Sequence, residues 1–312
     1  MRIGVDIMGG DFAPEKIIQG AILALDEISA STQIVLFGEI SKIKFYLRKY
    51  KVDYNKFTIV NCTDIIEMGE HPTKAFKQKP DSSISKAFSY LSKGDIDGLS
   101  SAGNTGAMFV GGLYTVKAVN GILRPVISTL LPREDGGVVV LLDVGANADC
   151  KPDVLYQFGI LGSIFSKYVC GINNPKVKLL NLGEEETKGN LLTQAAYQMM
   201  DKNPDFNFKG NIEGRDIFNT DVDVIVSDGF TGNIVLKQAE GFYSIMSKRG
   251  LVDDYFSRFN YENYGGTPIL GLNKPVIIGH GISNEIAIKN MILLTKDIIE
   301  ADLNDKIKET LN

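Results

Sequence analysis

The sequence predicts an α/β fold with a mostly parallel, mixed sheet, and three observations support this prediction. Short runs rich in β-branched residues alternate with amphipathic helical patterns along almost the whole chain. Most of these runs are continuously apolar, which is typical of strands that helices cover on both faces. The runs at 125–131 and 137–144 are separated only by a short polar turn, so we expect one antiparallel hairpin in the sheet.

The predicted strands and helices follow one another along the chain without an evident linker or repeat. Pro14 suits a first helical turn, and the segment SSISKAFSYLSKGD (82–95) starts with serine and ends near a glycine. We expect a single domain over residues 1–312, with two lobes as an alternative arrangement. Strands are predicted at 2–7, 33–38, 57–62, 97–102, 125–131, 137–144, 176–182, 222–227 and 275–279, and the main helices at 14–29, 82–95, 187–201, 234–242 and 284–303.

The composition indicates a soluble globular protein. Of the 312 residues, 44% are hydrophobic and 23% are charged, and the net charge is −5. No basic stripe is present, so we expect no nucleic-acid partner. No run approaches the ~20 apolar residues that cross a bilayer, and the N-terminus lacks an apolar signal segment. The three cysteines show no paired spacing. We therefore expect a cytoplasmic protein, with contact at a membrane surface left open.

Five predicted strands end in loops of a similar composition. These loops are rich in glycine, which permits close backbone approach, and in Ser, Thr and Asn, which supply short hydrogen-bond donors. One such loop is usually a simple turn or helix cap. Five of them at the carboxyl ends of parallel strands predict one cleft that suits an anion, phosphate above all. The loops are VDIMGGD (5–11), SSAGNTGA (100–107), DVGAN (143–147), LGEEETKGN (182–190) and SDGFTGN (227–233).

Lys188 is the candidate cation of these loops. It lies at the start of the helix predicted over 187–201, where the helix dipole disfavours a cation by ~0.3–1 kcal/mol. One interpretation is a lysine held toward a bound anion or a developing oxyanion. The alternative is a solvated lysine that the glutamates at 184–186 balance.

Other reactive side chains are few. His280 follows a predicted strand and either faces the cleft or is a structural imidazole. Cys150 has no histidine near it in sequence, which favours a structural thiol over a nucleophile. Asp6, Asp11, Asp143 and Asp228 have the chemistry to hold Mg²⁺ together, yet each also fits a backbone cap, which is the commoner use. The sequence contains no Walker loop, no GxGxxG fingerprint, no HExxH and no GxSxG elbow.

In order along the chain, eight motifs resemble those of the phosphate acyltransferase family of bacterial phospholipid synthesis (PlsX). They are GVDIMGGDFAPE, KPDSS, SAGNTGA, DVGANADCKP, GEEETKGN, SDGFTGN, YGG and PVIIGHG, and they span nearly the full chain. The resemblance implies a three-layer α/β/α homodimer similar to isocitrate and isopropylmalate dehydrogenases. It also implies transfer of an acyl group from acyl-acyl carrier protein to inorganic phosphate. The acyl phosphate would then feed a membrane acyl phosphate:glycerol-3-phosphate acyltransferase.

The resemblance assigns catalysis to two residues, Lys188 and Asn233, and both are present. Phosphate is ionised at neutral pH, and the leaving thiol has a pKa near ~8.5, so neither a general base nor a metal is required. We therefore expect no cofactor. We assign Lys188 to the anion or oxyanion and Asn233 to the acyl carbonyl oxygen. The residues expected to bind phosphate or substrate are Asp6, Gly9, Gly10, Asp11, Ser101, Asn104, Thr105, Asn147, Asp228, Thr231, Gly232 and His280.

Three other functions fit the same sequence less closely. A phosphate acetyl- or butyryltransferase acting on acyl-CoA would use the same cleft. A decarboxylating dehydrogenase would need arginines for a substrate carboxylate, and the five loops contain none. A ligand-binding regulator without catalysis would not need Lys188.

Two surface segments bear on the partners. The densest basic cluster comprises Lys74, Lys77, Lys79 and Lys86, and it either docks an acidic carrier protein or is simply solvated. The segment 234–263 is shorter than the apolar, cationic hairpin of relatives that associate with membranes. Its apolar face contains Leu251, Val252, Tyr255, Phe256 and Phe259, but Asp253 and Asp254 interrupt the basic residues. We expect this face to pack on the domain or on a dimer partner, with weak or no membrane contact.

Overall fold

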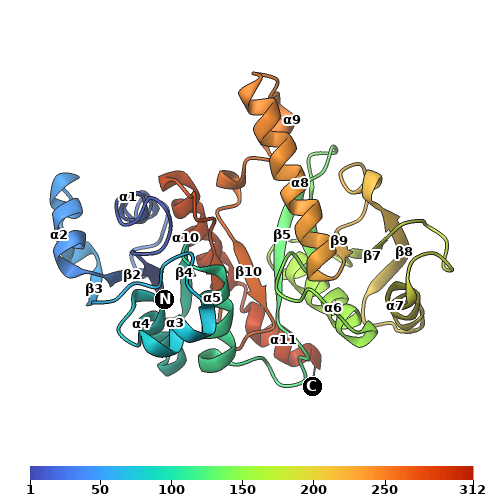
Figure 1. The fold of residues 1–312 in the computed structure, drawn as a ribbon, viewed down its shortest axis with the longest axis horizontal. Coiled ribbons are helices and arrows are strands. Elements are labelled where there is room, and N and C mark those ends of the chain that lie inside the picture. Colours follow the sequence, from blue (N-terminus) through green and yellow to red (C-terminus); the bar gives the residue numbers. More distant parts are fainter. Residues whose placement is uncertain (312) are drawn as a thin grey trace. The chain divides into compact units, whose positions relative to one another are not determined.

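The computed structural model describes residues 1–311, which divide into two compact units. Unit 1 comprises Met1–Ala118 and Tyr261–Asn304, and unit 2 comprises Val119–Asn260 together with the residues from Asp305 onward. Figure 1 labels the elements of both units. Each unit contains a mostly parallel sheet with one antiparallel pair, so the predicted α/β class with a mixed sheet is confirmed.

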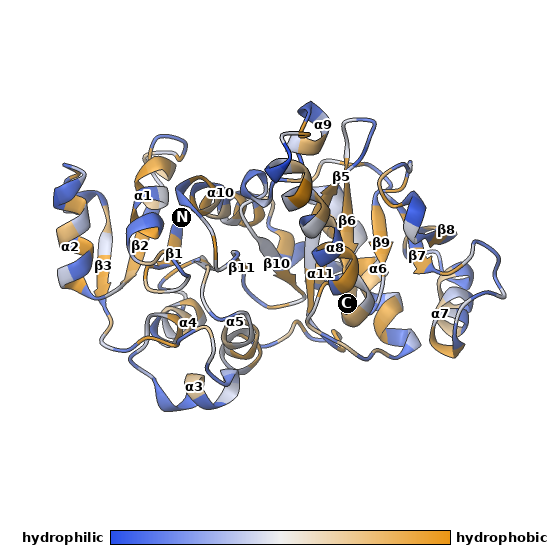
Figure 2. Cartoon of the chain, turned by 45° about the horizontal axis from the view of Figure 1, so that its top comes forward, coloured by the Kyte–Doolittle hydropathy of each residue, from blue (hydrophilic) through white to orange (hydrophobic). Residues whose placement is uncertain are grey.

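Unit 1 is built on six strands in the order β3-β2-β1-β4-β11-β10, and only the β10–β11 pair is antiparallel. Its strands are β1 Arg2–Asp6, β2 Gln33–Gly38, β3 Thr58–Asn61, β4 Gly98–Ser101, β10 Thr267–Leu270 and β11 Val276–Ile278. Its helices are α1 Glu15–Ala24, α2 Ile40–Lys49, α3 Pro72–Gln78, α4 Ser83–Lys93, α5 Thr105–Gly111 and α10 Glu285–Glu300, with short turns η1 Tyr54–Lys56, η2 Gly112–Val116 and η4 Tyr261–Asn263. Figure 2 shows α1 and α10 on one side of these strands and α4 and α5 on the other.

Unit 2 contains five strands in the order β5-β6-β9-β7-β8, and β5 and β6 form the predicted antiparallel hairpin. The strands are β5 Val126–Pro132, β6 Val138–Leu142, β7 Lys176–Asn181, β8 Asn207–Glu213 and β9 Val224–Val226. The helices are α6 Pro152–Tyr168, α7 Leu191–Lys202, α8 Gly229–Lys248 and α9 Asp254–Ser257, with the short turn η3 Gly214–Asp216; α11 Leu303–Leu311 ends the described chain. The strands β5, β6 and β9 are largely buried, as continuous apolar runs require.

The helix signals in the sequence are confirmed where a cap is present. Ser82 caps α4 by accepting a hydrogen bond from the Ser85 N–H, and Gly94 ends the helix with φ of 77°. The predicted helix over 187–201 is wrong at its start. Gly189 has φ of 93°, which a helix does not tolerate, and Asn190 caps a helix that begins only at Leu191.

Two strands escaped prediction. The β8 segment NFKGNIE contains asparagine and glycine, and the β10 segment TPIL contains proline, so neither has the composition of a strand. In the structure both are strands because neighbouring strands hydrogen-bond with them, β7 with β8 and β11 with β10. Tertiary pairing overrides the local signal in both cases.

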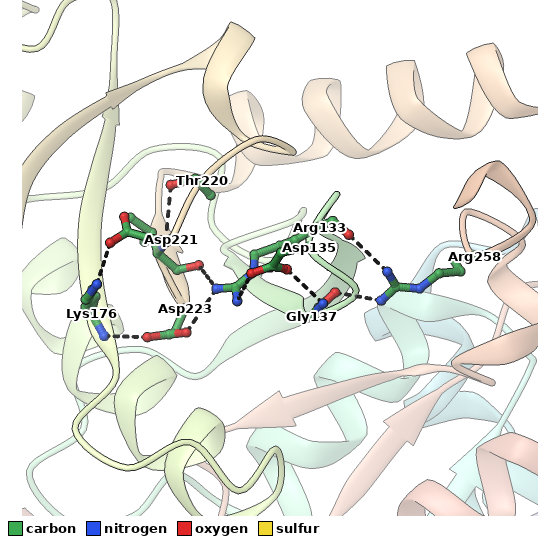
Figure 3. A network of polar contacts seen from close by, with 9 residues as sticks. Arg133, Asp135, Gly137, Lys176, Thr220, Asp221, Asp223 and Arg258 are labelled. Carbon is green, nitrogen blue, oxygen red and sulfur yellow. Dashed lines mark hydrogen bonds and ion pairs between the residues drawn. The ribbon is translucent and has the colours of Figure 1, made fainter. Parts of the chain in front are cut away.

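A polar network ties the β5–β6 hairpin to two other parts of unit 2 (Figure 3). Arg133 donates to Asp223 at 3.1 Å and to the Val222 carbonyl at 2.9 Å. Arg258, just after α9, donates to the carbonyls of Arg133 and Gly137 at 3.0 and 2.6 Å. These charge-assisted bonds fix α9 against the hairpin.

Next to this network lies a cavity of about 360 Å³. Its lining is mainly aromatic and comes from the loop around η3, from α8 and from the segment 255–259. Tyr255, Phe256 and Phe259 contact one another edge-on or tilted, and Phe259 also stacks on Phe218. The aromatic part of the apolar face expected in this segment therefore packs within unit 2, whereas Leu251 is 57% exposed. Among residues 1–311, no helix combines the length and the apolar character that a membrane crossing needs.

Candidate active site

The site residues predicted in unit 1 gather around the buried carboxylate of Asp6, at the end of β1. Asp6 accepts a hydrogen bond from the Ser101 hydroxyl at 2.6 Å and one from the Met8 N–H at 3.0 Å. Burial raises the pKa of Asp6, while the bonds from Ser101, Ser83 and the backbone oppose the shift. Asp6 and Ser101 are therefore scaffold residues that join the loops after β1 and β4.

Glycines let these loops approach each other closely. A Cβ at Gly9 would lie 2.6 Å from the Gly103 Cα, and Gly10 has φ of 106° with the Gly281 carbonyl next to it. The Asp11 N–H donates to that carbonyl at 2.7 Å, so the loop after β11 joins the same cluster. His280, in that loop, contacts Tyr261 in a tilted arrangement with ring centroids 4.9 Å apart.

Asn104 and Thr105 begin α5, and their roles differ. The Asn104 side chain accepts from the Ala107 N–H and donates to three backbone carbonyls at 67–70. Its amide is thus committed to holding a loop. Thr105 is exposed at the first position of the helix.

In unit 2, the buried Asp143 organises the DVGAN loop after β6. Its carboxylate accepts from the backbone N–H groups of Gly145, Ala146 and Asn147 at 2.7–3.0 Å, and from the Asn147 side chain at 2.8 Å. Burial raises the pKa of Asp143, against the effect of these hydrogen bonds. Asn147 also donates to the Pro125 carbonyl at 2.9 Å, so this predicted binding residue is held from both sides.

The SDGFTGN segment, predicted as a loop before a helix at 234–242, instead contains the first turn of α8, which begins at Gly229 and packs on the DVGAN loop. Asp228 caps the helix by accepting from the Thr231 N–H at 2.8 Å and from the Thr231 hydroxyl at 2.9 Å. Gly232 has no room for a side chain, because a Cβ there would collide with the Asp143 carbonyl oxygen. Asn233 donates from Nδ2 to the Val144 carbonyl at 2.9 Å, which fixes the orientation of its amide.

Lys188 lies in the loop after β7, the strand that is paired with β9. This loop precedes α7, so Lys188 lies outside the helix and not at its start. Its side chain is exposed, and within residues 1–311 the amine forms neither a hydrogen bond nor an ion pair. An exposed amine of this kind fits both interpretations, a solvated lysine near the glutamates at 184–186 and a lysine held ready for an anion. No described contact joins Lys188 to the loop 227–233.

Two asparagines that the sequence did not single out hold the Lys188 loop. Asn181 donates to the Lys188 carbonyl at 3.2 Å. Asn211, which is 2% exposed, donates to the Glu185 carbonyl at 3.0 Å. Asn181 lies near the end of a strand that the sequence predicts, which is a local signal, whereas Asn211 lies in the unpredicted strand β8 and has no such signal.

The other reactive groups have structural surroundings. Burial raises the pKa of Cys150 to about 12, and Cys150 Sγ lies 3.6 Å from the Asn147 carbonyl oxygen, so the thiol is a poor nucleophile at neutral pH. Asp6, Asp143 and Asp228 all act as caps or turn-forming groups. In the part of the chain that the structure describes, no three Asp, Glu, His or Cys side chains form a group that would hold a metal ion.

Comparison with known proteins gives a match along the whole chain. Residues 1–249 and 244–306 match the family model described as fatty acid synthesis protein. The chain is 41% identical over 331 residues to a phosphate acyltransferase of Dictyoglomus turgidum, covering 100% of this chain and 98% of that protein. It is 42% identical over 334 residues to a phosphate acyltransferase of Halothermothrix orenii, covering 100% and 99%.

Solved structures share the fold at low identity. A phosphotransacetylase from Streptococcus pyogenes has a TM-score of 0.68 and 20% identity, covering 96% of this chain and 94% of that chain. A branched-chain phosphotransacylase from Enterococcus faecalis V583 has a TM-score of 0.60 and 14% identity, covering 95% and 99%. These similarities concern the fold alone.

Proposed function

Because this chain belongs to the fatty acid synthesis protein family, to which phosphate acyltransferases belong, it is an acyltransferase, and we propose that it transfers a fatty acyl group from acyl-acyl carrier protein to inorganic phosphate. The products would be acyl phosphate and free carrier protein. The observation that carries the proposal is the 41–42% identity to phosphate acyltransferases along the full chain.

The chemistry of the loops supports this reaction. A phosphate oxygen attacks the thioester carbonyl, and the pantetheine thiolate leaves when the tetrahedral intermediate collapses. Phosphate is already an anion and the thiol is a good leaving group, so the enzyme has to supply proximity and oxyanion stabilisation. Glycine-rich loops, amides and one lysine suit that task without a nucleophilic side chain.

Asn233 is the group that we assign to the acyl carbonyl oxygen. An asparagine amide has two N–H donors, and the Val144 carbonyl accepts one of them. The second donor remains for the carbonyl oxygen, in an orientation that the first bond fixes. Such a preset donor is worth ~2.7–4 kcal/mol of barrier in comparable oxyanion sites.

Lys188 is the group that we assign to phosphate or the oxyanion. Its amine has no partner within residues 1–311, and hydrogen bonds from Asn181 and within the loop hold its backbone. In unit 1, we assign phosphate contacts to the backbone of Gly9 and Gly10, to Thr105 and to His280, whereas Asp11 would hold the loop through its N–H bond to the Gly281 carbonyl. Asp6, Ser101 and Asn104 would act by holding these loops, and Asn147, Asp228, Thr231 and Gly232 would do so in unit 2.

We propose that part of the basic cluster docks the carrier protein. Lys79 and Lys86 form ion pairs with Glu70 and Asp81 at 2.6 and 2.9 Å, so their charges are partly neutralised. Lys74 and Lys77, on α3, are exposed, and we propose that they attract the acidic carrier. Reversing both charges with Lys74→Glu and Lys77→Glu should raise the KM for acyl-carrier protein and flatten its salt dependence. An unchanged KM and salt slope would exclude this docking surface.

The wider setting is also proposed. We propose a cytoplasmic homodimer whose product a membrane acyl phosphate:glycerol-3-phosphate acyltransferase consumes, with at most weak, salt-sensitive contact between this chain and the membrane.

One assay tests the function. Phosphate-dependent release of free thiol is measured with acyl-acyl carrier protein and with acyl-CoA, next to reduction of NAD⁺. We expect thiol release mainly from acyl-acyl carrier protein, together with acyl phosphate formation. Preference for acyl-CoA would favour the second candidate, a phosphate acetyl- or butyryltransferase. We keep this candidate because the chain shares its fold with a phosphotransacetylase. The absence of any turnover would indicate a ligand-binding regulator.

A further inference from the structure

The loop that carries Lys188 has little to hold it except hydrogen bonds. Every residue from 184 to 188 is exposed, and Gly183 and Gly189 flank this stretch. Within the loop, the Lys188 N–H donates to the Glu185 carbonyl at 3.1 Å. A lysine on a loose loop would lose much of its value, because catalysis depends on donors that are already in place.

Asn211 provides an anchor for this loop from the strand beside it. Asn211 lies on β8 opposite Leu179 of β7, and its side chain is buried. Its Nδ2 atom donates to the Glu185 carbonyl at 3.0 Å and reaches the Glu184 carbonyl at 3.5 Å. The Glu185 carbonyl therefore accepts from both the Asn211 side chain and the Lys188 backbone, which links the two residues through one atom.

The amide of Asn211 is satisfied on one side only. Its Oδ1 atom is buried and has no hydrogen-bond partner among the described residues. An unpaired buried carbonyl oxygen costs free energy, so an apolar residue would suit this strand position better if packing were its only task. The retained cost points to a task for the Nδ2 donor.

We propose that Asn211 is a positioning residue that acts through Lys188, a role that rests on the proposed function. By holding the 184–185 carbonyls, it sets the turn from which the lysine amine projects toward the phosphate or oxyanion. Asn211 itself touches no substrate in this proposal.

The test uses Asn211→Leu in the full-length chain. Leucine has a similar shape, fills the buried site and removes both the Nδ2 donor and the unpaired oxygen, so thermal stability should stay near that of the native protein. We expect kcat/KM for phosphate to fall at least tenfold while the KM for the acyl donor is unchanged. Amide exchange at Lys188 should accelerate at least tenfold.

A matched control and a double variant separate positioning from general damage. Asn207→Leu, on the same strand, removes a side-chain hydrogen bond to the Asn174 carbonyl at 3.3 Å. This control should change neither the activity nor the amide exchange at Lys188. Asn211→Leu combined with Lys188→Ala should be no less active than Lys188→Ala alone, because both act on one group. The positioning role would be overturned if the activity losses of the two single variants multiplied in the double variant. It would also be overturned if Asn211→Leu kept the native activity and the native amide-exchange rate at Lys188. If the native chain forms no acyl phosphate from any acyl donor, the proposed function fails first, and the positioning role fails with it.

Discussion

At the scale of single residues, the candidate site separates groups that hold loops from groups that face outward. Asp143 and Asn104 are buried, and their side chains are spent on backbone contacts. Lys188 has an exposed amine with no partner among residues 1–311. Asn233 lies between these extremes, with one N–H committed to the Val144 carbonyl. Substitutions at these two kinds of position should therefore affect stability and turnover differently.

Lys188→Ala tests the outward-facing kind. We expect acyl phosphate formation to fall by at least 100-fold, about 2.7 kcal/mol of barrier, while the melting temperature stays unchanged because the side chain is exposed. Lys202→Ala, an exposed lysine at the end of α7, is the control and should behave as the native protein. Activity of Lys188→Ala within tenfold of native would remove the lysine from the proposed mechanism.

Cys150→Ala tests whether a thiol takes part. Burial raises the pKa of Cys150 to about 12, so the thiol stays protonated from pH 6 to 9 and should contribute no inflection to the pH–rate profile there. We expect the variant to keep its activity within about twofold, and iodoacetamide to react slowly with the native thiol. A burst of acyl-enzyme that Cys150→Ala abolishes would contradict this expectation.

At the scale of elements, α8 depends on a close approach between its first turn and the end of β6. Gly232 faces the Asp143 carbonyl without space for a Cβ, whereas Gly241, in the same helix, has no atom within 4 Å of such a Cβ. The close approach therefore requires a glycine at position 232, whereas the space around position 241 would accept a side chain.

The pair Gly232→Ala and Gly241→Ala measures this difference. Gly232→Ala should destabilise the protein by ~1–3 kcal/mol through overpacking and should also displace Asn233. Gly241→Ala should stabilise it by ~0.5–1 kcal/mol, because alanine orders more easily in a helix. Urea denaturation of both variants decides the matter. Equal stabilities would mean that the first turn of α8 shifts without cost.

The elements also show what the sequence can and cannot reveal. Segment 82–95 announces its helix through a capping serine and a terminal glycine, both local signals. The sequence alone suggests that Lys188 starts a helix, because the identity of Gly189 does not reveal that its φ is positive and delays the helix. Asn211 was invisible because its partners are backbone carbonyls more than twenty residues away, on a neighbouring strand end. Local chemistry predicts caps and loops, whereas positioning across strands depends on pairing that only the fold reveals.

At the scale of the whole molecule, surface charge and the aromatic segment decide how the protein meets a membrane. The net charge of −5 repels anionic lipid. Arg258, one of the few cations of the segment 234–263, is bound to two carbonyls of the β5–β6 hairpin. Tyr255, Phe256 and Phe259 pack together around the cavity of unit 2. The aromatic face of this segment is thus engaged within unit 2, although Phe242, Ile245 and Leu251 remain exposed.

Flotation with anionic liposomes at physiological salt checks this expectation. We expect most of the protein to stay at the bottom of the gradient, with a small bound fraction that higher salt releases. Phe256→Glu should not change that distribution. Our interpretation of this segment would be wrong if most of the native protein rose with the lipid and Phe256→Glu abolished the effect.

The order of the two units along the chain has a consequence for synthesis on the ribosome. All strands of unit 2 lie between Val126 and Val226, whereas unit 1 needs β10, β11 and α10, which come after residue 260. Unit 2 can therefore complete its sheet while unit 1 still waits, with the edge of β4 lacking its partner β11 and α1 lacking α10. An unpaired strand edge invites aggregation. The nascent chain is thus most vulnerable between the emergence of β4 and that of α10, an interval in which chaperone binding would matter most.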